Sequence, residues 1–182
     1  MARQRKKLLI VDGYNVLRSG SRYRHLRDGV PNPDYADDAF NRAREALIND
    51  VVAYAGRDFE AVIVFDGARN EFSDGSCERI AGVRIMFSRA GDSADKVIEK
   101  LSRDARERGI ETMVVTSDAT IQNTVFGFGV DRMSANGFSH AVEVNHHEYD
   151  LDERPRVAVK NTVSERLDPS VRAKLAALRD SL

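Results

Sequence analysis

The run Leu8-Leu9-Ile10-Val11-Asp12-Gly13 is a short apolar segment that ends in an acidic turn, and Ala61-Val62-Ile63-Val64-Phe65-Asp66-Gly67 repeats this form. Apolar runs of four to six residues are typical of strands buried on both faces of a parallel sheet. Further strands are expected at 83–87, 112–116 and 130–133. Helical periodicity predicts helices over 35–55, from Asp92 or Ser93 to 108, from Ser117 to 126, and over 139–149. This alternation predicts an α/β fold with three layers, a central and mainly parallel sheet flanked by helices.

Two connections and the end of the chain carry weaker patterns. A polar loop is expected over 18–34, and a glycine-containing excursion is expected between Gly67 and the strand at 83–87. From Leu151 the texture changes to scattered charges, with a last short helix expected over 169–182. We therefore expect one catalytic or binding domain over 1–150 and a basic extension over 151–182 that packs on it.

The chain has 182 residues, of which 42% are hydrophobic, and this suits one compact domain with a sizeable core. It holds no run of about 18 apolar residues and no signal-peptide core, so we expect a cytoplasmic protein that does not enter a membrane. The single cysteine, Cys77, excludes an internal disulfide framework and a cysteine-rich zinc site.

The formal net charge of −1 hides a gradient along the chain. Residues 1–30 hold eight basic and two acidic side chains, whereas residues 31–118 hold twelve basic and eighteen acidic ones. Unless the folded chain mixes these blocks, they predict a basic surface beside an acidic site. The early basic residues Arg18, Arg22, Arg24 and Arg27, with Tyr14, Tyr23 and His25 between them, suit contacts to phosphates and bases of RNA. An ordinary solvated loop has the same composition.

Acidic side chains follow the expected strands where these end. Asp12, Asp66 and Asp118 each end or follow a strand, and Asp92 and Asp95 open the helix after the strand at 83–87. Because carboxyl ends of parallel strands meet at one edge of a sheet, we expect these acids along one rim. If the strands are ordered 83–87, 61–65, 8–11 and 112–116, Asp12 and Asp118 lie on adjacent strands, with Asp66 and Asp95 flanking them.

Clustered carboxylates repel one another unless protons or cations neutralise them, and hard oxygen ligands suit Mg²⁺ or Mn²⁺. Each acid alone has a simpler interpretation, since Asp often begins turns and caps helices. The whole set on one rim favours a metal site. Asn15 suits a role in orienting a water or carboxylate, or a turn; Ser117 suits a phosphate contact or a helix cap. No Gly-x-Gly-x-x-Gly follows the first strand and no phosphate-binding P-loop motif occurs, so no nucleotide cofactor is expected.

Four motifs in one order carry a resemblance to a known family: Asp12-Gly-Tyr-Asn15, Val64-Phe-Asp-Gly67, Gly91-Asp-Ser-Ala-Asp-Lys-Val-Ile-Glu99 and Val115-Thr-Ser-Asp118. Together they resemble the NYN domain family, and most closely its bacterial YacP-like branch, over about residues 8–144. The resemblance implies a PIN-like fold and a metal-dependent endoribonuclease with Mg²⁺ or Mn²⁺. It also implies RNA as the partner, including messenger RNA on ribosomes.

The resemblance also implies roles for single residues. Asp12, Asp66, Asp95 and Asp118 are expected as catalytic acids, with Asp12, Asp95 and Asp118 as metal ligands and Asn15, Asp92 and Ser117 in support. Both Asp92 and Asp95 fit the acidic motif, so the sequence leaves open which of them faces the metal. A rival interpretation is a non-catalytic RNA- or ribosome-binding module of the same fold, which would bind RNA without cleaving it. A phosphotransfer domain is disfavoured, because neither Asp12-Gly-Tyr nor Asp66-Gly-Ala supplies its second acid.

Overall fold

The computed structural model describes residues 6–28, 36–67, 75–125, 127 and 129–153. The chain divides into two compact units, Met1–His147 and Glu148–Leu182. Of the second unit the structure describes only the end of one helix, so the helix predicted over 169–182 and most of the basic extension lie outside the described residues.

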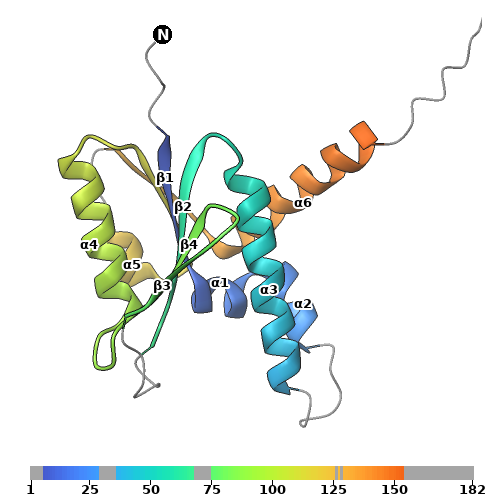
Figure 1. Cartoon of the computed structure of the whole chain (residues 1–182), viewed down its shortest axis with the longest axis horizontal. Helices are drawn as coiled ribbons and strands as arrows, with labels where there is room; N and C mark the ends of the chain where they lie inside the picture. Colours follow the sequence, from blue (N-terminus) through green and yellow to red (C-terminus); the bar gives the residue numbers. More distant parts are fainter. Residues whose placement is uncertain (1–5, 29–35, 68–74, 126, 128, 154–182) are drawn as a thin grey trace, which may run out of the picture. The chain divides into compact units, whose positions relative to one another are not determined.

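The first unit is built around a six-stranded sheet in the order β3-β4-β2-β1-β5-β6 (Figure 1). The strands are β1 (Lys7–Asp12), β2 (Phe59–Phe65), β3 (Cys77–Ile80), β4 (Val83–Phe87), β5 (Thr112–Val115) and β6 (Val130–Met133). All neighbouring pairs are parallel except β3 with β4. The α/β prediction and the order of the four central strands are confirmed. β1 and β5 are adjacent, which is where the strand order reverses and where open sheets bind ligands.

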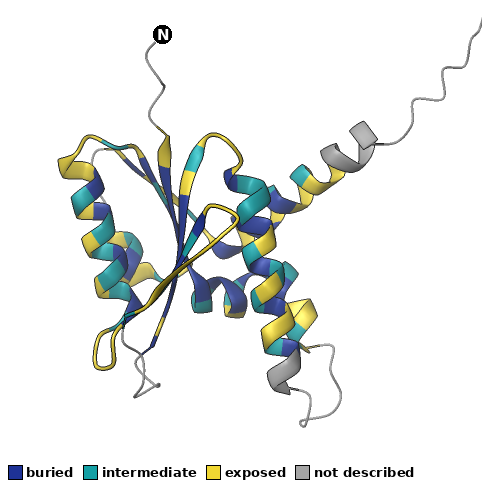
Figure 2. Cartoon of the chain, in the orientation of Figure 1, coloured by how far each residue is buried: buried dark blue, intermediate teal, exposed yellow. Residues whose placement is uncertain are grey.

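Helices cover both faces of the sheet, as the three-layer prediction requires. They are α1 (Gly13–Ser19), α2 (Ser21–Asp28), α3 (Ala36–Ala55), α4 (Ala94–Glu107), α5 (Ala119–Thr124) and α6 (Ala135–Glu153). One core joins alternate strand residues such as Leu9, Val11 and Ile63 to α1, α2, α3 and α6. The other joins Ile10, Val64 and their neighbours to α4 and α5. Figure 2 shows the buried central strands between these two layers.

The polar loop predicted over 18–34 is wrong for residues 18–28, which form the end of α1, the junction residue Gly20 and all of α2, whereas 29–34 lie outside the described residues. The two helices have local causes that a hydrophobic pattern does not show. Asp12 caps α1, and Gly20 separates α1 from α2. A Cβ at Gly20 would lie 2.7 Å from the Val16 carbonyl oxygen, so the helix junction leaves no room for a side chain.

Two further boundaries differ from expectation. β3 lies in the segment predicted as an excursion; all four of its residues are exposed, so it has no buried periodicity to detect. α6 begins at Ala135, four residues before the predicted start. There the Ser134 hydroxyl accepts the Gly137 N–H at 3.0 Å and acts as a cap, which tolerates a glycine in the first turn. No described helix is long and apolar enough to cross a membrane.

Candidate active site

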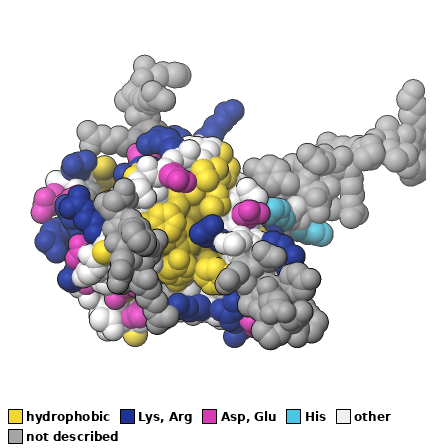
Figure 3. Space-filling view, turned by 60° about the horizontal axis from the view of Figure 1, so that its bottom comes forward, with side chains coloured by type: hydrophobic (Ala, Val, Ile, Leu, Met, Phe, Trp, Pro, Cys, Tyr) yellow, Lys and Arg dark blue, Asp and Glu magenta, His cyan; other side chains and the backbone are white. Residues whose placement is uncertain are grey.

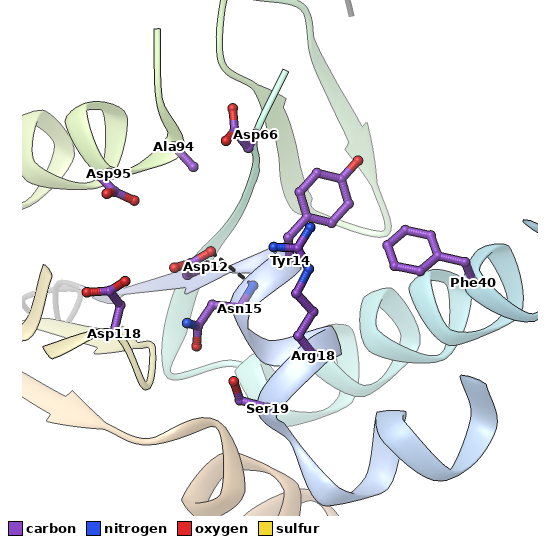
Figure 4. Close-up of a pocket in the computed structure, with 10 residues that line it drawn as sticks. All are labelled: Asp12, Tyr14, Asn15, Arg18, Ser19, Phe40, Asp66, Ala94, Asp95 and Asp118. Carbon is purple, nitrogen blue, oxygen red and sulfur yellow. Dashed lines mark hydrogen bonds between the residues drawn. The ribbon is translucent and has the colours of Figure 1, made fainter. Parts of the chain in front are cut away.

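A pocket of about 500 Å³ opens at the carboxyl ends of the parallel strands. Four of the predicted acids, Asp12, Asp66, Asp95 and Asp118, line this pocket together (Figure 4). They come from the end of β1, the end of β2, the first turn of α4 and the start of α5. The remaining lining residues are Tyr14, Asn15, Arg18, Ser19, Phe40 and Ala94. The predicted rim of carboxylates is therefore present.

Asp12 is the most buried of these acids, with 6% of its surface exposed. One carboxylate oxygen accepts the Asn15 N–H at 3.3 Å, and the other accepts the Thr116 hydroxyl at 3.0 Å. Burial raises the pKa of Asp12 to about 6; the two hydrogen bonds oppose this rise, and the charges of Asp95 and Asp118 add to it. Within the described part of the chain, Asp12 has no ion pair with Lys or Arg. No described Lys or Arg therefore compensates its charge.

Asp118 acts both as a helix cap and as a pocket residue. Its Oδ1 accepts the N–H groups of Thr120 and Ile121, at 2.7 and 3.4 Å, and so starts α5. Its own N–H donates to the Thr116 hydroxyl oxygen at 3.1 Å. Thr116 is fully buried and therefore connects Asp12 to Asp118. Capping fixes this carboxylate at the rim, so the simpler interpretation of Asp118 is confirmed and is compatible with the functional one, which stays a prediction.

The structure distinguishes Asp95 from Asp92. Asp95 lines the pocket, and burial raises its pKa, with Asp118, Asp66 and Glu99 adding to the rise. Asp92 lies before α4, which Ser93 caps, and is outside the pocket lining. Its carboxylate is 3.6 Å from the Lys96 ammonium. Asp95 is thus the acid of this motif that the fold brings to the rim.

Asp66 is exposed at the end of β2, and the buried Ser88 hydroxyl lies 3.3 Å from its Oδ1. The same hydroxyl accepts the Gly67 N–H at 2.8 Å, so Ser88 fixes the turn that carries Asp66. Gly13 has a comparable role after β1, because a Cβ there would overlap the buried Phe65 ring. The close approach of Phe65 explains why glycine follows Asp12.

The two supporting polar residues bridge loops at the pocket. Asn15 lies in α1, not in a turn, and its side-chain oxygen accepts the Ser117 N–H at 2.7 Å. The Ser117 hydroxyl accepts the Ala135 N–H at 3.0 Å, at the start of α6. Ser117 is therefore a cap, but for α6 rather than α5, and it is outside the pocket lining.

The four arginines predicted to bind RNA have different environments. Arg18 lines the pocket and Arg24 is exposed. Arg27 lies 3.1 Å from Asp28, and Arg22 makes a 2.7 Å ion pair with the buried Asp50. The Tyr23 ring, considered for stacking on bases, is fully buried and its hydroxyl donates to Asp50 at 3.0 Å. That role for Tyr23 is wrong.

Sequence reasoning missed Thr116, Ser88 and the aromatic residue Phe40 as parts of the site. Thr116 lies within the Val115-Thr-Ser-Asp118 motif, but its hydroxyl donates to Asp12, which is 104 residues away in the sequence. Phe40 comes from α3, far from every motif. A pattern along the chain gives no signal for contacts of this kind, which depend on strand order and helix packing.

The donor chemistry of the pocket fits Mg²⁺ or Mn²⁺, because it offers several carboxylates whose mutual repulsion a cation would relieve. As placed, no three His, Cys, Asp or Glu side chains of the described residues are close enough to surround one ion. Mg²⁺ commonly binds through one or two carboxylates and retains several waters, so the residues suit an ion held partly through water.

Comparisons with known proteins agree with this architecture. The sequence model of the YacP-like NYN domain matches residues 9–180. The chain is 30% identical to the protein YacP of Bacillus subtilis over 136 residues, which is 75% of each chain. A crystal structure of a point mutant of Rae1 (YacP) from Bacillus subtilis superposes with a TM-score of 0.60 at 25% identity, over 94% of this chain and 99% of that one.

A second crystal structure of Rae1 (YacP) from Bacillus subtilis matches in fold, with a TM-score of 0.62 at 24% identity, over 96% of this chain and 95% of that one. The NYN domain has a PIN-like nuclease fold, which implies RNA as its substrate. Since the family model spans almost the whole sequence, this chain belongs to the YacP-like NYN domain family.

Proposed function

We propose that this protein is a metal-dependent endoribonuclease that hydrolyses phosphodiester bonds of RNA. The observation that carries the proposal is the environment of Asp12, a buried carboxylate that forms no ion pair with a Lys or Arg among the described residues and shares its pocket with three further acids. Without bound metal, the negative charge of such a cluster repels a polyanion such as RNA. Divalent cations would change its sign, which is why we favour a nuclease over a non-catalytic RNA- or ribosome-binding module.

Asp12, Asp95 and Asp118 would hold Mg²⁺ or Mn²⁺. The bound ion would lower the pKa of the attacking water and stabilise negative charge on the phosphate. Asp66, exposed at the rim, would orient that water and take up its proton. The water oxygen would bond to phosphorus while the bond from phosphorus to the 3′ oxygen breaks, and the 3′ oxygen would take a proton from solvent, which leaves 5′-phosphate and 3′-hydroxyl ends.

The chain's other residues would hold these groups in place. Thr116 keeps Asp12 and Asp118 at a fixed separation, and Asn15 ties α1 to the loop that carries Asp118. Arg18, at the pocket, and Arg24, exposed on α2, would bind phosphates on either side of the cleaved bond. As a narrower proposal, the substrate is messenger RNA on ribosomes, which the family resemblance implies.

Cleavage of 5′-labelled single-stranded RNA in Mg²⁺, in Mn²⁺ and in EDTA tests the proposal. We expect metal-dependent cleavage, and we expect Asp12→Asn and Asp118→Asn each to lose more than the roughly 10- to 100-fold that changes outside the first ligand shell cost. Asp95→Asn and Asp92→Asn form a matched pair, of which only Asp95→Asn should lose activity. Asp131→Asn, exposed on β6, is the control.

If Asp12→Asn and Asp118→Asn cleave as well as the natural sequence, the assignment is wrong. Salt-sensitive binding of RNA without cleavage in either metal would favour the binding module instead. For the ribosomal substrate, we expect the protein to sediment with ribosomes at low salt. Cleavage of free RNA with no such sedimentation would separate the activity from that partner.

A further inference from the structure

The pocket has two unlike walls. The carboxylates of Asp12, Asp66, Asp95 and Asp118 line one side, whereas Tyr14, Arg18 and Phe40 lie on the other (Figure 4). Figure 3, with the carboxyl ends of the strands turned forward, shows hydrophobic side chains gathered in the middle of this face, with both basic and acidic side chains around them. The metal chemistry proposed above uses the acidic wall and gives the aromatic wall no role.

The aromatic wall is fixed from behind by other rings. The Tyr14 ring centroid is 5.1 Å from that of the fully buried Phe65 and 5.7 Å from that of Phe40. Phe65 in turn stacks on Phe87, with centroids 5.5 Å apart and planes inclined by 25°. Tyr14 and Phe40 are half-buried, so each presents part of a ring to the pocket while its other contacts hold it in place. Rings held in this way need no reorganisation to accept a planar ligand.

A cation completes this wall. The Arg18 guanidinium carbon lies 5.8 Å from the centre of the Tyr14 ring, within the range of a cation–π contact. Arg18 is exposed and forms no ion pair with an acid among the described residues, so its donors are available to a ligand. A flat apolar surface beside a guanidinium that no described acid pairs with matches the two parts of a nucleotide, because the base stacks on rings and the phosphate accepts from arginine.

We propose that Tyr14 and Phe40 form a subsite that stacks one unpaired nucleobase, while Arg18 binds the phosphate of the same nucleotide. The identity of that nucleotide as part of RNA rests on the function proposed above. The subsite places this base next to the bond that is cleaved, so the substrate must have an unpaired nucleotide there. Ring surfaces accept every base, and we expect a modest preference for purines, which offer the larger surface for stacking.

Cleavage of RNA with one abasic position tests the subsite. In a series of otherwise identical single-stranded oligonucleotides, the abasic nucleotide moves one step at a time past the cleaved bond. We expect one position beside that bond at which loss of the base lowers kcat/KM roughly ten-fold, the order found for base stacking on aromatic side chains. Tyr14→Leu and Phe40→Leu should lower kcat/KM similarly on intact RNA, and should remove the sensitivity to the abasic nucleotide at that position.

Matched variants separate stacking from simple damage to the fold. Tyr14→Phe keeps the ring, so stacking predicts that it retains the sensitivity to the abasic nucleotide that Tyr14→Leu loses. Tyr54→Leu removes a half-buried ring that stacks on Phe59, with centroids 6.0 Å apart, away from the pocket, and should cleave normally. A scan in which no abasic position matters would overturn the subsite, and this result depends only on the unmodified protein, so it decides the question even if a variant fails to fold.

A binding measurement keeps the subsite distinct from the nuclease activity. Asp118→Asn, in which we expect cleavage to be lost, is titrated with RNA carrying 2-aminopurine at the sensitive position or, without cleavage to define it, at each position. Stacking should change the fluorescence of this base, and Tyr14→Leu in the same background should abolish the change. If the signal is present but RNA is never cleaved by any form of the protein, the subsite stands and the nuclease proposal fails. If RNA is cleaved but no fluorescence change depends on Tyr14, the nuclease proposal stands and the subsite fails.

Discussion

Two buried aspartates of this protein, Asp12 and Asp50, have opposite surroundings. Asp50 is 2% exposed and lies on α3, where it accepts hydrogen bonds from Arg22, Tyr23 and His146. Asp12 is 6% exposed and accepts hydrogen bonds from a backbone N–H and a hydroxyl, without an ion pair to any described cation. The charges of Asp95 and Asp118 have the same sign as that of Asp12 and help to raise its pKa.

The comparison shows how one residue type serves two purposes. A buried carboxylate with its own arginine is internally neutralised and joins α2, α3 and α6. In a buried carboxylate among other acids, folding disfavours the ionised form. Ionisation becomes favourable when a cation binds from solution. The stability of the protein should therefore respond in opposite directions when the two aspartates lose their charge.

The largest expected effect is that of Asp50→Asn. The change removes the negative partner of Arg22, whose Nε lies 2.7 Å from the carboxylate, and leaves one charge of a largely buried pair uncompensated. We expect the free energy of unfolding in urea to fall by about 3 kcal/mol. Glu45→Gln, exposed on the same helix, is the control and should change it by less than about 0.5 kcal/mol. If Asp50→Asn lowers the free energy of unfolding no more than Glu45→Gln does, the ion pair of Asp50 does not stabilise the fold and the contrast with Asp12 is wrong.

The opposite sign is expected for Asp12→Asn. With a pKa of about 6 in the folded state and an ordinary value of 3.8, the ionised carboxylate is disfavoured by folding at pH 7. At 1.36 kcal/mol per pKa unit the penalty is about 3 kcal/mol, and asparagine loses part of one hydrogen bond in exchange. We therefore expect a net gain of about 2 kcal/mol in urea at pH 7 without metal, together with loss of cleavage. A destabilised variant would show that Asp12 is compensated after all.

The same pKa sets the pH dependence of that gain. Protonation of Asp12 stabilises the folded state fully below about pH 3.8, and this contribution is lost as the pH rises through about 6. Asparagine carries no charge at any pH, so the variant's gain should be greatest near pH 7 and should disappear as the pH falls toward 4, where only its weaker hydrogen bond distinguishes it from the natural sequence. Urea melts at half-unit steps measure it. A difference independent of pH would mean that charge is not its cause.

Metal should replace the proton as the stabilising partner. At ten times its dissociation constant, an ion that binds only the folded state adds about 1.4 kcal/mol to stability. We expect Mg²⁺ or Mn²⁺ to raise the melting temperature of the natural sequence at pH 7 and to leave that of Asp12→Asn nearly unchanged. Glu45 is exposed on α3 and does not line the pocket, so Glu45→Gln should respond to metal as the natural sequence does. Equal shifts in all three proteins would place the ion elsewhere.

The sequence predicted the surroundings of Asp12 but not those of Asp50, because only Asp12 owes its position to a pattern in the neighbouring sequence. The apolar runs before Asp12, Asp66 and Asp118 define the strands and also position the acids, so strand order and the rim follow from one pattern. Asp50 lies within a helix next to the buried Val51, and its partners Arg22, Tyr23 and His146 come from α2 and α6. No periodicity brings residues 96 positions apart into contact.

The errors follow the same division. α1 and α2 were missed because they depend on the Asp12 cap and on the tight junction at Gly20, not on apolar periodicity. β3 was missed because all its residues are exposed. The choice between Asp92 and Asp95 also needed coordinates, because both satisfy the motif and only the start of α4 at Ala94 decides which one reaches the pocket.

The smallest expected effect belongs to His146, and it identifies which partner neutralises Asp50. His146 Nε2 lies 2.9 Å from Asp50, but half of its side chain (49%) is exposed, whereas that of Arg22 is 31% exposed and donates through two nitrogens. Solvent screens the exposed contact, so His146→Gln, which can still donate, should cost no more than about 0.5 kcal/mol in urea. His147→Gln, exposed beside it, is the control. A loss approaching that of Asp50→Asn would assign the neutralising role to the histidine.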